Sequence, residues 1–180
     1  MRKVVLFIAM SLDGYIADSR GGVDWLNGHG NNDENMDTYT EFVKDIDTVL
    51  MGWNTYHQIV TELSPEEWIY HEFTTYVFTH RECEPSRQIH FTSENPVGLL
   101  ERLKQEAGKD IWICGGANLV QQLVSENVID EYYISVIPVL LGDGIRLFGS
   151  MKHEIKLKLY KTRTYHGITE LIYMRSLKQS

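Results

Sequence analysis

The chain has 180 residues, of which 43% are hydrophobic, and a formal net charge of -8 at pH 7. This length suits one domain with a sizeable core, and the hydrophobic content excludes a disordered chain. Nucleic acids and anionic membranes are bound by clustered positive charge, so the acidic balance argues against both as main partners.

Residues 3–9 form a continuous apolar run, which predicts a strand that is buried on both faces. Arg2 and Lys3 precede the apolar stretch at 4–10, but that stretch is too short for a signal peptide. Cys83 and Cys114 form neither a disulfide framework nor a zinc motif, and the seven histidines are scattered. We therefore expect a cytoplasmic protein with reduced thiols and no metal site.

The stretch from Ser11 to Asn35 is rich in Gly, Asp and Asn, which predicts a long functional or mobile loop. An amphipathic helix is expected at 35–45, and strands and helices alternate after it. The expected strands cover 48–51, 75–79 and 110–114, and the expected helices cover 54–60, 96–107 and 117–126.

The C-terminal part is rich in strands, which are expected at 129–137, 154–164 and 169–175 with glycines at the turns. Alternating strands and helices followed by a strand-rich end predict an α/β fold. We expect a mostly parallel central sheet with an antiparallel C-terminal edge.

Two of the expected strands end in glycine and open into a helix, at Gly52 and at Gly115-Gly116. Glycine lets the backbone approach a ligand closely, and helix N-termini attract anions. In an open α/β sheet, ligands bind at the carboxyl ends of the strands. The pair predicts a site for a pyrophosphate-bearing cofactor. Neither turn matches a G-x-G-x-x-G or Walker pattern, so ordinary strand–helix turns are the alternative.

An ordered series of motifs runs along nearly the whole chain: Ser11-Leu12-Asp13-Gly14-Tyr15-Ile16-Ala17, Asp24-Trp25-Leu26, Met51-Gly52-Trp53-Asn54-Thr55-Tyr56, Gly115-Gly116-Ala117-Asn118, Ile129-Asp130-Glu131 and Pro138-Val139-Leu140-Leu141-Gly142-Asp143-Gly144. This series resembles the dihydrofolate-reductase-like family related to the C-terminal reductase domain of bifunctional riboflavin biosynthesis (RibD-type) proteins. The resemblance implies one such domain over residues 1–180, three αβα layers and often a homodimer. It also implies a nicotinamide cofactor, usually NADPH, with NADH as the alternative.

The resemblance places the cofactor on the first strand, the two glycine turns and the loop after residue 78. The implied cofactor-binding residues are Ala9, Ile16, Ala17, Gly52, Asn54, Thr55, Thr79, His80, Arg81, Gly115, Gly116, Ala117, Asn118 and Leu119. Trp53 stands where dihydrofolate reductases usually carry an arginine for the 2′-phosphate of NADPH. That contact would therefore shift to Arg81 or His80, unless Arg81 is simply solvated.

The proton donor of dihydrofolate reductases is a carboxylate near the start of the first helix, and Asp37 matches it best, with Glu34 and Glu41 nearby. An acidic residue there also favours the helix dipole, which is the alternative reading of Asp37. Trp25 matches a tryptophan near the substrate ring, or it anchors the loop. Asp13 is a second acidic candidate on the substrate side, or a turn former.

The function expected from these residues is hydride transfer from NAD(P)H to a small heterocycle. The substrate would be a pterin or a 5-amino-6-ribosylamino-pyrimidine. One alternative is a non-catalytic protein that binds the nicotinamide nucleotide and keeps the reductase fold. Another is a mainly structural dimer that associates through the apolar stretch Tyr132–Leu141.

Overall fold

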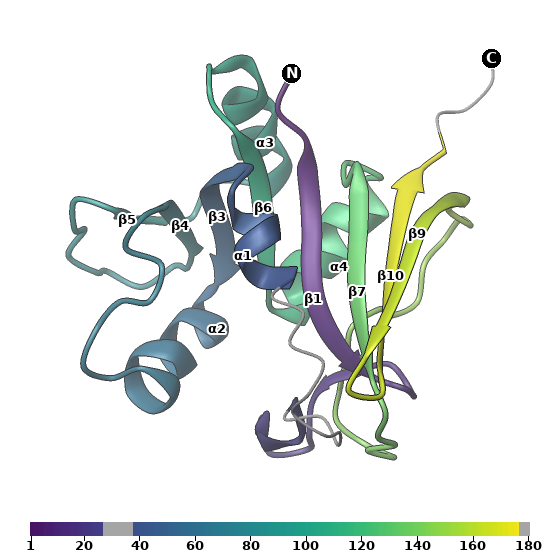
Figure 1. Ribbon diagram of the computed structural model, residues 1–180. Coiled ribbons are helices and arrows are strands. Elements are labelled where there is room, and N and C mark those ends of the chain that lie inside the picture. The colour runs from purple at the N-terminus through teal and green to yellow at the C-terminus, as the bar shows by residue number, and fades with distance from the viewer. Residues whose placement is uncertain (27–37, 177–180) are drawn as a thin grey trace.

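The computed structural model describes residues 1–26 and 38–176, and it is built on an eight-stranded sheet in the order β5-β4-β3-β6-β1-β7-β10-β9 (Figure 1). The strands are β1 (Val4–Ser11), β3 (Ile46–Gly52), β4 (Thr74–Phe78), β5 (Ile89–Thr92), β6 (Asp110–Gly115), β7 (Glu131–Ile137), β9 (Leu157–Tyr165) and β10 (Ile168–Arg175). Pairing is parallel from β5 to β7, and β10 runs antiparallel to both β7 and β9. The predicted parallel sheet with an antiparallel C-terminal edge is confirmed.

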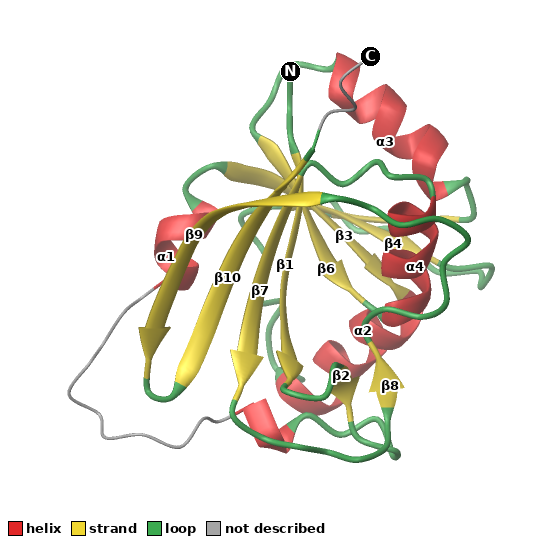
Figure 2. Cartoon of the chain, turned by 90° about the vertical axis from the view of Figure 1, so that its right-hand side faces the viewer, coloured by secondary structure: helices red, strands yellow, loops and turns green. Residues whose placement is uncertain are grey.

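Helices cover both faces of the sheet, with α3 (Pro96–Gln105) and α4 (Ala117–Ser125) on one side and α1 (Thr38–Val43) on the other (Figure 2). The strands feed the two layers alternately. Leu6 packs in the cluster that contains α3 and α4, whereas Phe7 stacks on Phe42 of α1 with 4.2 Å between the ring centroids. Because both faces are covered, the apolar run of β1 needs no polar alternation.

Local sequence explains how the α3 helix begins. The Asn95 side chain accepts hydrogen bonds from the backbone N–H groups of Val97 and Gly98, and Pro96 occupies the first turn. Three leucines of α3 are buried, as its apolar spacing predicts. Among the described residues, no helix is both long and apolar enough to cross a membrane.

Several boundaries differ from the sequence prediction. The stretch after Ser11 contains β2 (Tyr15–Ala17), which pairs with β8 (Ile145–Arg146), and a 3-10 turn at Asp24–Leu26. The helix expected from residue 54 is α2 (Trp53–Gln58), and it continues as a π-helical turn at Ile59–Leu63. The strand expected from 154 begins at Leu157, and the helix expected at 35–45 is described only from Thr38.

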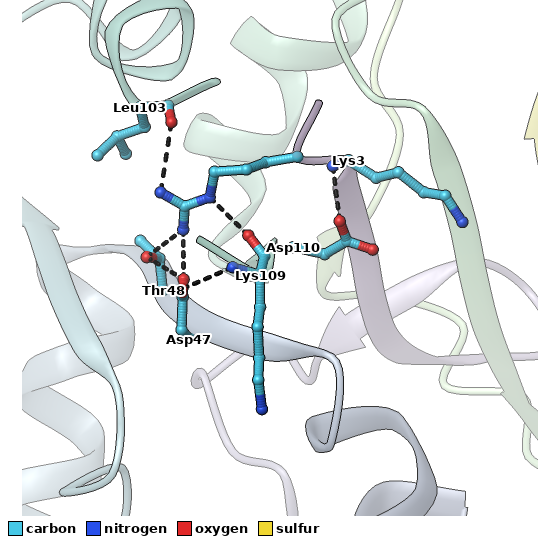
Figure 3. Close-up of polar contacts among 7 residues, drawn as sticks. Lys3, Asp47, Thr48, Leu103, Lys109 and Asp110 are labelled. Carbon is cyan, nitrogen blue, oxygen red and sulfur yellow. Dashed lines mark hydrogen bonds and ion pairs between the residues drawn. The ribbon is translucent and has the colours of Figure 1, made fainter. Parts of the chain in front are cut away.

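A buried arginine joins three elements at the amino edge of the sheet (Figure 3). The guanidinium of Arg2 donates to the carbonyls of Lys109 at 2.5 Å and Leu103 at 3.3 Å, and to Thr48 Oγ1 at 2.6 Å. It also forms an ion pair with Asp47. The Arg2 side chain is only 5% exposed, so these partners replace the water that burial removes.

We predict that Arg2→Ala lowers the free energy of unfolding by about 2 to 4 kcal/mol, because it leaves buried acceptors without a donor. Urea unfolding followed by circular dichroism measures this loss. Arg102→Ala is the matched control, since the Arg102 side chain is 52% exposed in its pair with Glu94 and should lose less than about 1 kcal/mol. Equal losses in the two variants would contradict the anchoring role of Arg2.

Asp13 ties the turn after β1 to the loop that follows β7. Its carboxylate accepts hydrogen bonds from Ser11 Oγ at 2.6 Å and from the backbone N–H groups of Leu141 at 3.1 Å and Gly142 at 2.7 Å. These hydrogen bonds, led by that of Ser11, lower the pKa of Asp13 to about 2. Asp13 therefore holds two loops together as an ionised group.

We predict that Asp13→Asn lowers the melting temperature at pH 7. Because folding lowers the pKa of Asp13 from 3.8 to about 2, its stabilisation is present above pH 3.8 and is lost as the pH falls towards 2. The difference in melting temperature between wild type and variant should therefore narrow over that window in a calorimetric pH series. A difference that stays constant from pH 6 to pH 2 would contradict this role.

Candidate functional site

A cavity of about 850 Å³ lies at the carboxyl ends of β1, β3 and β6. We call it the main cavity. In the sheet, β1 lies between β6 and β7, both of which come late in the chain. The strands that follow β1 in the chain thus lie on both sides of it, and ligands of open α/β sheets bind at such a switch in strand order. The volume of the main cavity is within the range of small-molecule sites.

The two glycine turns meet in the wall of the main cavity. A Cβ added to Gly52 would lie 3.8 Å from the backbone nitrogen of Gly116, and one added to Gly116 would lie 3.2 Å from Thr55 Oγ1. Gly115 has a φ of +131°, which L side chains rarely adopt, and its peptide bond to Gly116 is cis. The turns predicted separately from the sequence thus form one surface made largely of backbone.

The N-terminus of α4 opens onto this surface. Gly116 is the N-cap residue with extended backbone, and among the described residues no side chain caps it. The first N–H groups of a helix lack intrahelical acceptors and carry the positive end of the dipole. The start of α4 is therefore suited to hold an anionic group of a ligand.

Most of the predicted cofactor residues come together here. Those that line the main cavity are Ala9, Ile16, Ala17, Gly52, Asn54, Thr55, Gly115, Gly116, Ala117, Asn118 and Leu119. Thr79, His80 and Arg81 do not line it. The proposed substrate residues Trp25 and Asp13 do not line it either, and Asp37 and Glu34 lie outside the described residues.

Arg81 nevertheless reaches the rim. Its guanidinium carbon lies 5.0 Å from the centroid of the Trp53 ring, and Trp53 lines the main cavity. Thr79 Oγ1 accepts a hydrogen bond from the backbone N–H of Arg81 at 3.1 Å. Trp53, which the resemblance places where dihydrofolate reductases carry an arginine, thus has an arginine over its ring, and this contact positions a positive charge beside the cavity.

Trp25 is held within its own loop, because its indole Nε1 donates to the carbonyl of Gly22 at 3.2 Å. Its neighbours Val23 and Leu26 line the main cavity. This geometry supports the loop-anchor reading of Trp25, while its contact with substrate stays a prediction.

Two acidic candidates, Glu41 in α1 and Asp13 in the turn after β1, are held in their ionised form. Glu41 pairs with Arg163 at 2.6 Å, and this hydrogen bond lowers the pKa of Glu41. The pKa of Asp13 is lowered as well. A group that donates a proton at neutral pH needs a raised pKa, so neither is suited to that task. Asp37 as the proton donor stays a prediction.

Sequence reasoning missed one wall of the main cavity. It is formed by the π-helical turn and the loop after it, through Ile59, Glu62, Leu63, Ile69 and Tyr70. Cys114 also lines the main cavity. The only local signal for this wall was the position of Cys114 directly before Gly115. Side chains in loops, such as Tyr70, cannot be found in this way because a loop leaves no periodic pattern in the sequence.

Tyr70 and Cys114 form a neutral pair in this wall. The Tyr70 hydroxyl lies 3.8 Å from Cys114 Sγ. Burial raises the pKa of Cys114 to about 11, and burial also raises the pKa of Tyr70. Both groups therefore keep their protons at neutral pH.

Comparison with known proteins places this chain in a family. The family model described as the RibD C-terminal domain matches residues 2–169. The protein YwjB of Bacillus subtilis (strain 168) is 41% identical over 97% of this chain and 99% of its own length.

Two solved structures show the same fold at low identity. One is a diaminohydroxyphosphoribosylaminopyrimidine deaminase/5-amino-6-(5-phosphoribosylamino)uracil reductase of Thermotoga maritima, with a TM-score of 0.71, 16% identity and coverage of 97% of this chain and 57% of that chain. The other is a dihydrofolate reductase of Enterococcus faecalis complexed with NADP(H), with a TM-score of 0.62, 14% identity and coverage of 96% of both chains. The fold is thus dihydrofolate-reductase-like, and the chain belongs to the RibD C-terminal domain family.

Proposed function

We propose that this protein is an NADPH-dependent reductase that transfers hydride to a C=N or C=O bond of a small heterocycle. The observation that carries the proposal is the contact of two glycine turns in the wall of the main cavity, with the start of α4 open beside it. The family and the NADP(H)-complexed structure of the same fold support it.

The residues present fit a dinucleotide. A Cβ at Gly115 would contact Ile8, and a Cβ at Gly116 would contact Thr55. Because glycine has no side chain, the backbone N–H groups of this turn are accessible to a bound pyrophosphate. Ala9, Ile16 and Ala17 would surround the nicotinamide end. Bound NADPH would supply the hydride, as the hard chemistry in such enzymes belongs to the cofactor.

The chain itself would supply orientation, a dry environment and a proton. Ala9, near the end of β1, and Ile16, in β2, line the main cavity with apolar side chains, which would limit water at the reacting end. β2 is held in place by pairing with β8 and by Asp13 at its base. Asp37 is our candidate for the group that protonates the substrate.

We predict that NADPH binds the wild-type protein and that Gly116→Ala weakens this binding about tenfold or more, since the added Cβ meets Thr55 Oγ1 and narrows the anion site. Titration followed by nicotinamide fluorescence measures the dissociation constant. Gly98→Ala is the control, because a Cβ at Gly98 meets nothing within 4 Å. If wild type fails to bind NADPH at millimolar concentration, the proposed function is wrong.

Cofactor preference depends on Arg81 in this proposal. We predict that Arg81→Ala weakens NADPH binding about tenfold and leaves NADH binding within about twofold of wild type, because only NADPH carries a 2′-phosphate to pair with the guanidinium. Parallel titrations with both nucleotides measure the two changes. An equal loss for NADPH and NADH would show that Arg81 acts only through its contact with Trp53.

The second candidate function is non-catalytic nicotinamide-nucleotide binding. It is favoured by the engagement of Glu41 and Asp13 in hydrogen bonds that keep both ionised. Stoichiometric NADPH binding without oxidation across pterins, pyrimidines and quinones would favour this function over a reductase.

The homodimer implied by the family resemblance is also part of our proposal. The sedimentation coefficient of the protein in analytical ultracentrifugation tests it.

A further inference from the structure

The residues that line the main cavity come from both faces of the sheet. Ile8, Phe78 and Leu119 line it and belong to the apolar cluster of the α3 and α4 face. Tyr70 and Cys114 also line it and belong to the cluster of the opposite face. We call the part of the main cavity that Tyr70 and Cys114 line the α1-side lobe. A dinucleotide held at the open start of α4, on the other face, would therefore leave the described lining of the α1-side lobe for a second ligand.

The α1-side lobe is walled by apolar side chains and carries a carboxylate. Ile59, Leu63 and Ile69 provide the walls, and Glu62 lies between the first two on the π-helical turn. Burial of a flat ring against apolar side chains is favourable, because it removes apolar surface from water. A carboxylate beside them repels a phosphate or a second carboxylate.

Besides the Glu62 carboxylate, the Tyr70 hydroxyl is a polar group of this lobe. The Tyr70 ring is held edge-on against Trp112 at 5.2 Å and Trp68 at 5.4 Å between centroids, so its direction is set by packing. In the described part of the chain its hydrogen-bond partner is the Cys114 thiol at 3.8 Å. Sulfur is a weak acceptor, so an oxygen or nitrogen of a bound ring would be the better partner.

Resting on the proposed function, we infer that the α1-side lobe takes a flat, uncharged heterocycle without a phosphate or carboxylate tail, and that the Tyr70 hydroxyl donates the hydrogen bond that orients it. Tyr70 is thereby a specificity-determining residue. The raised pKa of its phenol, caused by burial, keeps the donor protonated at neutral pH.

Binding of matched probes to the NADPH-saturated protein tests the substrate class. The probes are 7,8-dihydroneopterin and its monophosphate, and 5-amino-6-ribosylaminouracil and its 5′-phosphate, measured by isothermal titration calorimetry. We expect at least one uncharged probe to bind, about tenfold or more tighter than its phosphate. Equal or tighter binding of the phosphates overturns the inference, as does failure of both uncharged probes to bind.

Variants test the residues. Tyr70→Phe should weaken the uncharged probe about tenfold, the value of one hydrogen bond, and leave NADPH affinity unchanged. Tyr56→Phe removes a phenol from the same aromatic cluster but away from the cavity lining, and should change neither affinity. Glu62→Lys should strengthen binding of the phosphorylated probe several-fold.

The outcomes separate this inference from the proposed function. NADPH affinity is measured first and without any probe, so its absence shows that the proposed function fails. Normal NADPH binding with Tyr70→Phe indistinguishable from wild type, at an unchanged melting temperature, shows that only the role of Tyr70 fails. Loss of NADPH and probe binding together in Tyr70→Phe would also overturn it, because the α1-side lobe and the dinucleotide site would then not be separate.

Discussion

The site depends on one constraint, the close approach of two strand–helix turns that glycine keeps free of side chains. β3 and β6 are parallel neighbours, and Met51 pairs with Gly115, so their carboxyl ends lie level. Gly52 and Gly116 then face each other across a gap that a Cβ would narrow. The start of α4, the end of β1 and the rim at Trp53 are arranged around this contact, and the main cavity is the space that remains.

The buried Arg2 ion pair and the candidate site lie at opposite edges of the same sheet. At the amino edge, Arg2 is buried among Asp47, Thr48 and backbone carbonyls and ties β1, β3 and the α3–β6 connection together. At the carboxyl edge, the strands end in glycine and loops. Asp13 joins two of these loops by charge-assisted hydrogen bonds. A rigid amino edge thus supports an open carboxyl edge that can accept ligands.

Sequence reasoning recovered what leaves a local pattern. The glycine turns, the apolar strands and the helix that follows Asn95 and Pro96 are each written in adjacent residues. It missed β2, β5 and β8, which are too short to show alternation. It also missed Glu170, which is 0% exposed within a strand because Tyr133 and Tyr165 each donate a hydrogen bond to its carboxylate at 2.8 Å. Tyr133 and Glu170 are 37 residues apart and meet only in the folded chain, so no short stretch of sequence reveals their contact.

The central claim is that the backbone of the second glycine turn holds the dinucleotide. The most direct measurement follows the backbone amide resonances of the isotope-labelled protein by NMR during titration with NADPH. We expect the amide resonances of Gly115, Gly116 and Ala117 to shift most and to saturate together, while that of Gly98 in α3 stays in place. Saturable shifts confined to other parts of the chain, with these three amides unmoved, would contradict it.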